Sequence, residues 1–289
     1  MAGSNARDIK RRIRSVRNIE HITNAMKLVS AAKLRRAKKT FEKTQEYLHY
    51  ITDNIDELFN SVEDIPSQYL LGSREIKKTC YIVITSNRGL AGSFNANVIK
   101  STERKMQASD EKPLLVCVGS KGRDYFAKRG YEVISEYLRP PENVSFVNTH
   151  EISKPIISLF DEGVIDEVVV VHTAFLSTFE QRVQTRRLLP FEIKKSDEVV
   201  QSEKQVDYEP GAEEVFNYLV PKYVEIMIYQ AIVESATCEH AARRMAMENA
   251  TDNAREMMGS LELHYNRARQ AAITKEITEI VSGADAVGG

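Results

Sequence analysis

The sequence lacks tryptophan and has only three cysteines among its 289 residues. Cys80, Cys117 and Cys238 are odd in number and no two have CxxC spacing, which argues against a disulfide framework and a zinc site. No uninterrupted apolar run approaches the ~20 residues that a membrane-spanning helix needs. The basic first residues precede no apolar segment, so we expect no secretory signal. These absences favour a soluble protein of a reducing compartment.

Glycine and proline are almost absent from both ends of the chain. Residues 4–65 contain neither, all eight prolines lie between Pro66 and Pro221, and only Gly259 interrupts the stretch from Pro221 to Gly283. Because these residues break helices, the sequence predicts two long terminal helices around a central domain. We expect Pro221 in the first turn of the second helix and Gly283 just past its end. The predicted domains are 1–65 (first helix), 66–220 (central domain) and 221–289 (last helix).

Apolar residues recur at helical spacing in both terminal segments and predict that the helices pair. Phe41, Thr44 and Leu48 begin an alternating step of three and four that is typical of a coiled-coil seam. Two such helices in one chain pair most simply antiparallel with each other; separate partners or a homo-oligomeric coil are the alternatives. The predicted contact faces are Ile9, Ile13, Val16, Ile19, Ile22, Met26, Val29 and 41–62 in the first helix, and Ala242, Ala246, Ala250, Ala254, Met258, Leu261, Tyr265, Ala268, Ala272, Ile273, Ile277, Ile280 and Ala284 in the last.

The middle of the chain, residues 76–210, has a different pattern. Short β-branched runs alternate with segments of helical spacing, which predicts βαβ units and a mostly parallel, doubly wound sheet. The predicted fold class is therefore α/β, with a long antiparallel coiled coil of the terminal helices projecting from this domain. Strands are predicted at 79–86, 114–119, 131–137, 167–175 and within 181–193, and helices near 93–107, 120–129 and 150–163.

A doubly wound sheet invites a test for nucleotide binding, and the usual motifs are missing. No GxGxxG follows a strand, and Gly119-Ser-Lys-Gly122 lacks the P-loop spacing. Gly89 and Gly92, between the first strand and a helix, are suited to anion binding, but a tight strand-to-helix turn is the better explanation of them. His172 and the cysteines occupy strand positions typical of packing residues. The sequence predicts no catalytic residue, cofactor or metal.

Charge is unevenly distributed although the chain as a whole carries only −1. Residues 1–50 contain 13 Lys and Arg and 4 Asp and Glu, a net charge of +9, whereas residues 211–289 carry −5. The arginines between Arg11 and Arg17 resemble a DNA-binding basic region. They share their helix with the apolar face of Ile9, Ile13 and Val16, so charge that faces solvent or a protein partner is the better interpretation, and we expect no nucleic acid.

Five segments, in order along the chain, carry a resemblance to a known family. They are ITNAMKLVSAAKLRRA (22–37), TSNRGLAGSFN (85–95), AARRMAMENATDNA (241–254), LELHYNRARQAAIT (261–274) and ITKEITEIVSGADAV (273–287). Together they resemble the gamma subunit of the bacterial F-type rotary ATP synthase. Asn87, Ala91 and Ser93 stand where this family more often has Asp, Cys and Gly, which affects only details of that turn.

The resemblance implies a non-catalytic rotor subunit in the central stalk, peripheral to the cytoplasmic face of a bacterial membrane. In the family, the coil lies inside a ring of three alpha and three beta subunits, and the foot lies with epsilon on the ring of c subunits. Rotation couples flow of hydrogen or sodium ions to ATP synthesis or hydrolysis and regulates ATPase activity. The extreme C-terminus, 284–289, would enter the hydrophobic sleeve of the alpha–beta ring. The alternative from the residues alone is a coiled-coil adaptor with a nucleotide-sensing α/β domain.

The resemblance also implies three groups of contact residues. Positions on the last helix would meet loops of the beta subunit, basic residues of the first helix would form a neck against acidic parts of beta, and residues of the central domain would contact the c ring or epsilon. The implied beta contacts are Arg243, Arg267, Arg269, Gln270 and Thr274; the neck contacts are Met26, Lys27, Lys33, Arg35 and Arg36; the foot contacts are Ser120, Lys121, Gly122, Tyr208 and Glu209.

Overall fold

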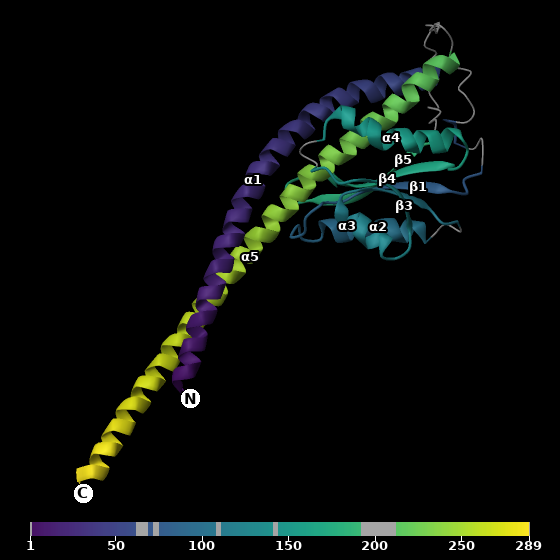
Figure 1. Ribbon diagram of the computed structural model, residues 1–289. Helices are drawn as coiled ribbons and strands as arrows, with labels where there is room; N and C mark the ends of the chain where they lie inside the picture. Colours follow the sequence, from purple (N-terminus) through teal and green to yellow (C-terminus); the bar gives the residue numbers. More distant parts are fainter. Residues whose placement is uncertain are drawn as a thin grey trace. The chain divides into compact units, whose positions relative to one another are not determined.

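The computed structural model describes residues 2–61, 69–71, 75–107, 111–140, 144–191 and 212–288. The chain divides into two compact units, Met1–Ala31 with Arg243–Gly289, and Ala32–Ala242. Two helices account for both ends of the chain: α1 (Ala2–Ser61) and α5 (Ala212–Gly288) (Figure 1). The prediction of two long terminal helices is confirmed, whereas the division into domains at 65 and 220 stays a prediction.

Helix α5 differs from the sequence prediction at both ends. It begins at Ala212 and contains Pro221 in its interior, so the assignment of Pro221 to the first turn is wrong. An interior proline removes one backbone hydrogen bond. Phe216, Val220 and Val224, on either side of it, are all buried in one apolar cluster, and this packing outweighs the local cost. Gly283 does not end the helix either, because α5 continues to Gly288.

The second unit contains a five-stranded sheet in the order β3-β2-β1-β4-β5. The first four strands of that order are parallel, and β5 pairs antiparallel with β4 at the edge. The strands are β1 (Thr79–Ile84), β2 (Leu114–Val118), β3 (Glu132–Tyr137), β4 (Glu167–Phe175) and β5 (Gln181–Leu189). The predicted α/β fold class, with a mostly parallel sheet between long terminal helices, is confirmed.

Helices cover both faces of this sheet (Figure 1). On one face α2 (Phe94–Met106) and α3 (Ser120–Ala127) pack against Tyr81 and Val83 of β1. On the other, α4 (Phe146–Asp161) and the first part of α5 pack against Ile82 and Ile84 of the same strand. Because successive strand residues point to opposite faces, β1 contributes to both cores and is buried along its whole length.

The carboxyl ends of β1 and β2 approach each other closely around Gly119. Gly119 has a φ of 96°, and a Cβ atom there would lie well inside van der Waals contact with the Thr85 carbonyl oxygen. The Thr85 hydroxyl accepts a hydrogen bond from the Gly122 N–H at 2.9 Å, so the start of α3 is held directly on the end of β1. Only glycine meets both the conformational and the spatial requirement at position 119.

In the first unit, α1 and α5 run antiparallel. Thr23 and Thr251 join their hydroxyls at 2.8 Å, Arg255 bonds Glu20 at 3.0 Å, and Arg17 lies 3.6 Å from Glu262. Along these three contacts the residue numbers decrease in α1 while they increase in α5, which confirms the predicted antiparallel pairing. Figure 1 shows the C-terminal end of α5 continuing past the start of α1.

The seam of this pair differs from the apolar prediction. Ile19, Ile22 and Val29 are 50%, 59% and 57% exposed, so their assignment to the contact face is wrong. The buried residues of α1 in the first unit are instead Val16, Glu20, Thr23 and Ser30. In the second unit Leu34, Phe41, Thr44 and Leu48 of α1 are also buried, and Phe41 packs edge-on against Phe175 of β4. These positions fit one heptad phase. The buried face of α1 is therefore set by the heptad repeat and includes polar residues in its middle.

The alanine positions of α5 are also only partly in the seam. Ala254 is buried together with Met247 and Thr251, while Ala246 and Ala250 are half-buried. Beyond them Met258, Leu261, Tyr265, Ala268 and Ala272 are the less exposed residues of their turns, as predicted. Ile273, Ile277 and Ile280 are 48%, 56% and 72% exposed, so their assignment to the contact face is wrong.

Replacement of Gly119 by alanine is expected to destabilise the second unit by about 3 kcal/mol or more, because strain at positive φ adds to the clash with the Thr85 backbone. Gly130→Ala is the control: its φ is 77°, but a Cβ there meets nothing within 4 Å, so about 1–2 kcal/mol of conformational strain is expected alone. Chemical denaturation of the full chain measures both, and equal losses would contradict the packing argument.

Ala254→Trp is expected to destabilise the α1–α5 pair by about 1–3 kcal/mol, because an indole overfills the seam. Asn253→Trp is the control, since the neighbouring side chain is exposed and a change there is expected to stay within about 0.5 kcal/mol. Thermal unfolding followed by circular dichroism measures both variants. If Ala254→Trp unfolds as the wild-type chain does, residue 254 does not lie in the seam.

Candidate functional site

The exposed side of α5 carries a regular stripe of residues. Leu263, Arg267, Gln270, Thr274, Ile277 and Val281 follow one another at steps of four and three, and all are exposed. At about 100° per residue these positions lie opposite the seam residues Leu261, Tyr265, Ala268 and Ala272. We call these six residues the outer stripe. Its mixture of aliphatic, amide and guanidinium groups is typical of a protein-binding surface.

Four of the five predicted beta contacts are exposed on α5, but they do not share one face. Arg267, Gln270 and Thr274 belong to the outer stripe, whereas Arg269 lies on another side of the helix, next to the seam. Arg243 differs from all four because only 9% of it is exposed, so most of its side chain already contacts the protein. A contact role for Arg243 stays a prediction. To bind beta, Arg243 would have to share its present contacts within the chain with beta or give them up.

The predicted neck residues on α1 separate into two kinds. Met26 and Lys27 are half-buried, while Lys33, Arg35 and Arg36 are exposed. Met26 also falls in step with Ile19, Ile22 and Val29, whose exposed apolar side chains form a second stripe on α1. The seam phase starting from Phe41 and Thr44, extended back along α1, would have placed these three residues outside the seam. The sequence had assigned these residues to packing between the helices. Because they are exposed, they become candidates for contact with a partner instead.

The predicted foot residues of α3 are largely engaged within the second unit. The Ser120 N–H donates to Asn87 Oδ1 at 2.9 Å, the Ser120 hydroxyl donates to the Asn87 carbonyl oxygen at 3.0 Å, and Gly122 is buried. Lys121 alone of the three has an exposed side chain. Tyr208 and Glu209 lie outside the described residues. The foot contacts stay a prediction, for which Lys121 is the best-placed side chain.

The crevice where doubly wound sheets usually bind ligands is occupied by the protein itself. That crevice lies at the carboxyl ends of the strands where the strand order reverses, here between β1 and β4. Ala91 of the turn after β1 and Phe94 at the start of α2 pack there against Cys238 of α5, with Phe175 and Ala242 beside them. Asn95 Oδ1 accepts the Ser86 N–H at 2.9 Å and further fixes the turn.

The N-terminus of α3, the second place suited to an anion, is satisfied by the same turn. Lys121 N–H donates to the Ser86 carbonyl oxygen at 3.1 Å, while the amides of Ser120 and Gly122 bond Asn87 and Thr85. Since the first amides of a helix bind an anion only when they lack protein partners, this helix end has little to offer a phosphate. Gly89 and Gly92 precede α2 instead, where the Phe94 N–H donates to the Ala91 carbonyl oxygen at 3.2 Å, which supports the interpretation of these glycines as a tight turn.

The remaining candidates for chemistry are buried. His172 lies 3.2 Å from Glu234 of α5, whose other oxygen accepts the Phe175 N–H at 2.9 Å, so the pair joins β4 to α5. Burial raises the pKa of the Cys80 and Cys117 thiols to about 12. Burial also raises the pKa of Cys238, and its Sγ donates to the Thr173 carbonyl oxygen. Within the described ranges no group of His, Cys, Asp and Glu residues has an arrangement that could hold a metal ion.

These features define a class of protein built on long paired helices, in which the usual ligand crevice of the α/β sheet is filled by the protein's own side chains. A family model described as ATP synthase matches residues 5–287. The chain is 46% identical over 289 residues to the ATP synthase gamma chain of Alkaliphilus metalliredigens, with 99% of each chain covered. The chain therefore belongs to the ATP synthase gamma-chain family, whose members are non-catalytic subunits of the complex.

Two further comparisons extend this result. The ATP synthase gamma chain, sodium ion specific, of Acetobacterium woodii is 40% identical, over 98% of this chain and 99% of the relative. Among solved structures, a chain of the Euglena gracilis mitochondrial ATP synthase (OSCP/F1/c-ring, rotational state 3) superposes with a TM-score of 0.76. It is 18% identical and covers 99% of this chain and 95% of its own, so it supports the fold. Among the described helices, none is long and apolar enough to span a bilayer.

The thiols give a test of this buried arrangement. We expect Cys80, Cys117 and Cys238 to resist alkylation at pH 8 in the folded chain and to react on unfolding, because burial disfavours the reactive thiolate. Thiolates form in the unfolded chain near the usual pKa of 9.0 but in the folded chain only near 12, so thiol burial also predicts stability that falls as pH rises above 9. Mass spectrometry after iodoacetamide pulses measures the labelling. Rapid labelling of any one thiol in the folded state would contradict its placement in the core.

Proposed function

We propose that this chain is the central-stalk rotor subunit of an F-type ATP synthase, transmitting rotation between the membrane ring and the catalytic ring. Membership of the gamma-chain family supports the general role. The structural observation that carries it is the antiparallel pairing of α1 with α5, with the outer stripe facing away from that seam. Such a pair offers a stiff shaft and, at the same time, an exposed surface for surrounding subunits.

Transmission of torque requires two helices that do not slide or swivel on each other. A purely apolar seam tolerates shifts of register, whereas polar pairs fix one register because a slip would leave them unpaired. The Thr23–Thr251 hydrogen bond and the Glu20–Arg255 ion pair supply two such fixed points within one stretch of the seam. A hydrogen bond of this kind contributes about 1 kcal/mol. Each hydroxyl also lies within hydrogen-bonding distance of a backbone carbonyl oxygen of its own helix, Glu20 for Thr23 and Met247 for Thr251.

Rotation acts on catalytic subunits only through unequal contacts. A shaft changes the affinity of a catalytic site for nucleotide only if it binds the open and closed states of that site differently. The outer stripe lies on one side of α5, so it presents a different surface to each subunit around it. Coupling free energies are reciprocal, so the same contacts let ATP hydrolysis drive the shaft in reverse.

The proposed partners are three alpha and three beta subunits, epsilon and the c ring. Arg267, Gln270 and Thr274 meet loops of beta, and Arg269 adds a second side of the helix. Basic side chains of α1, including Lys33, Arg35 and Arg36, meet acidic parts of beta, which agrees with the net charge of +9 over residues 1–50. Lys121 of α3 contacts epsilon or the c ring.

The chain acts at the cytoplasmic face of the bacterial cell membrane, attached peripherally through the c ring. The coupled ion is bound by the c ring rather than by this chain, so either hydrogen or sodium ions fit the proposal. The sodium-specific name of the relative at 40% identity agrees with use of both ions within the family. The alternative of a nucleotide-sensing adaptor loses its support, because α5 and the turn after β1 fill the usual crevice.

Recovery of the complex tests the proposal directly. A tagged chain expressed in its own host is purified from membranes, and the subunit masses and Mg-ATPase activity are read together. We expect two larger subunits in threefold excess over the tagged chain, with ATPase activity in the same fraction. A homo-oligomer of the chain without ATPase activity would overturn the rotor proposal and return the adaptor to consideration.

Variants of the outer stripe sharpen this experiment. Gln270→Leu and Thr274→Val are expected to lower ATP synthesis in membrane vesicles by about two- to tenfold, since each removes a polar contact to beta. Both side chains are exposed, so the unfolding temperature of the isolated chain should not change. His264→Leu, exposed on a different side of α5, is the matched control and should synthesise ATP as the wild type does.

A further inference from the structure

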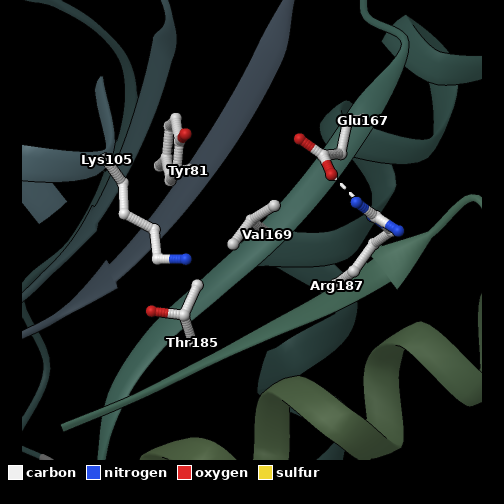
Figure 2. Close-up of a pocket in the computed structure, with 6 residues that line it drawn as sticks. All are labelled: Tyr81, Lys105, Glu167, Val169, Thr185 and Arg187. Carbon is white, nitrogen blue, oxygen red and sulfur yellow. Dashed lines mark hydrogen bonds and ion pairs between the residues drawn. The ribbon is translucent and has the colours of Figure 1, made fainter. Parts of the chain in front are cut away.

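The second unit has a pocket that the rotor function does not use. Its volume is about 410 Å³, and it is lined by Tyr81, Lys105, Glu167, Val169, Thr185 and Arg187 (Figure 2). These residues come from β1, the end of α2, β4 and β5. Glu167 is the first residue of β4, so the pocket lies toward the amino end of that strand. It is separate from the crevice at the carboxyl ends, which Ala91, Phe94 and Cys238 fill.

The acidic group of the pocket already has its partners. Glu167 Oε1 accepts a hydrogen bond from Arg187 Nε at 2.6 Å, and Glu167 Oε2 accepts one from the Thr79 hydroxyl at 2.9 Å. Glu167 is largely buried, so this ion pair is shielded from water on one side. The pair leaves the terminal nitrogens of the Arg187 guanidinium with hydrogen-bonding capacity.

Three donors of the pocket have no such partner. The Lys105 ammonium and the hydroxyls of Tyr81 and Thr185 make no hydrogen bond or ion pair with any part of the chain that the structure describes. Figure 2 shows the Lys105 amine directed into the space bordered by Tyr81, Val169 and Thr185. Burial, reinforced by the Glu167 charge, raises the pKa of Tyr81, so its hydroxyl keeps the proton that it can donate. Donors therefore outnumber free acceptors in this pocket.

The balance of charge and donors identifies the ligand. Lys105 and Arg187 against Glu167 leave one positive charge uncompensated, which favours an anion. Donors from three different elements suit a group with several acceptor oxygens in a tetrahedral arrangement better than a planar carboxylate. The volume exceeds that of a phosphate group alone, and the second lone pairs of the Glu167 oxygens can accept hydroxyl protons. We propose that the pocket binds a small phosphate monoester with a hydroxylated body, its phosphate held by Lys105, Tyr81, Thr185 and Arg187.

Calorimetric titration of the purified full chain tests this site, with inorganic phosphate and glycerol 3-phosphate as probes. We expect saturable binding of both probes, with glycerol 3-phosphate the tighter because its hydroxyls reach Glu167. Lys105→Met is expected to weaken both by about tenfold, as loss of a charge-assisted contact does. Lys100→Met is the matched control, since Lys100 is an exposed lysine of the same helix outside the pocket.

A second variant separates the site from general attraction to basic surface. Thr185→Val keeps the charge and nearly the shape of the pocket but removes one donor, and it should weaken phosphate by about threefold. Unfolding temperatures of all variants establish that the fold is retained. Absence of saturable binding by the wild-type chain overturns the proposal, and so do equal losses for Lys105→Met and Lys100→Met. Assembly with the catalytic subunits does not enter either result, so the rotor proposal is tested independently.

Discussion

The continuity of α5 is the constraint on which the rest of the structure depends. Within one uninterrupted helix, residues 231–241 are buried on every side within the second unit, whereas beyond Arg255 only one side of the helix is covered. A helix that is buried all round must satisfy every polar side chain it carries, while a helix covered on one side needs only a seam. The first half of α5 therefore needs partners for its buried polar side chains, whereas the half beyond Arg255 needs only one packed face.

Several polar side chains of the buried half have specific partners. Glu234 bonds His172 and the Phe175 N–H, and the Ser235 hydroxyl accepts the Thr173 N–H at 3.2 Å, so adjacent residues of α5 bind adjacent positions of β4. Glu225 is paired with His150 of α4 at 2.7 Å and with Lys222 at 3.0 Å. Loss of one partner from such a pair leaves an uncompensated buried charge, so these contacts fix the orientation of α5 on the sheet.

That fixed packing has a consequence for function. The same part of α5 that anchors to β4 also closes the ligand crevice, through Cys238 and Ala242. Doubly wound sheets often bind nucleotides, but here the ligand crevice is filled by a helix. The exposed candidate surfaces are the outer stripe of α5, the exposed apolar residues of α1 and the pocket beside Lys105. Function is therefore carried by the sites placed on the fold and not by the fold class.

The sequence by itself determined the two long helices, the positions of the five strands along the chain to within a few residues, and the gamma-chain resemblance, because breaker residues, hydrophobic period and motifs are local signals. The resemblance also implied Arg267, Gln270 and Thr274 as contact residues, but not the side of α5 that they share. The heptad phase of Phe41 and Thr44, extended back along α1, already places Ile19 and Ile22 outside the seam. Only the tertiary structure showed that this phase continues through the polar residues Glu20, Thr23 and Ser30, because the hydrophobicity of single side chains favoured the other face. The interior position of Pro221 and the engagement of Ser120 with Asn87 likewise depend on contacts between residues distant in the chain, which no local pattern encodes.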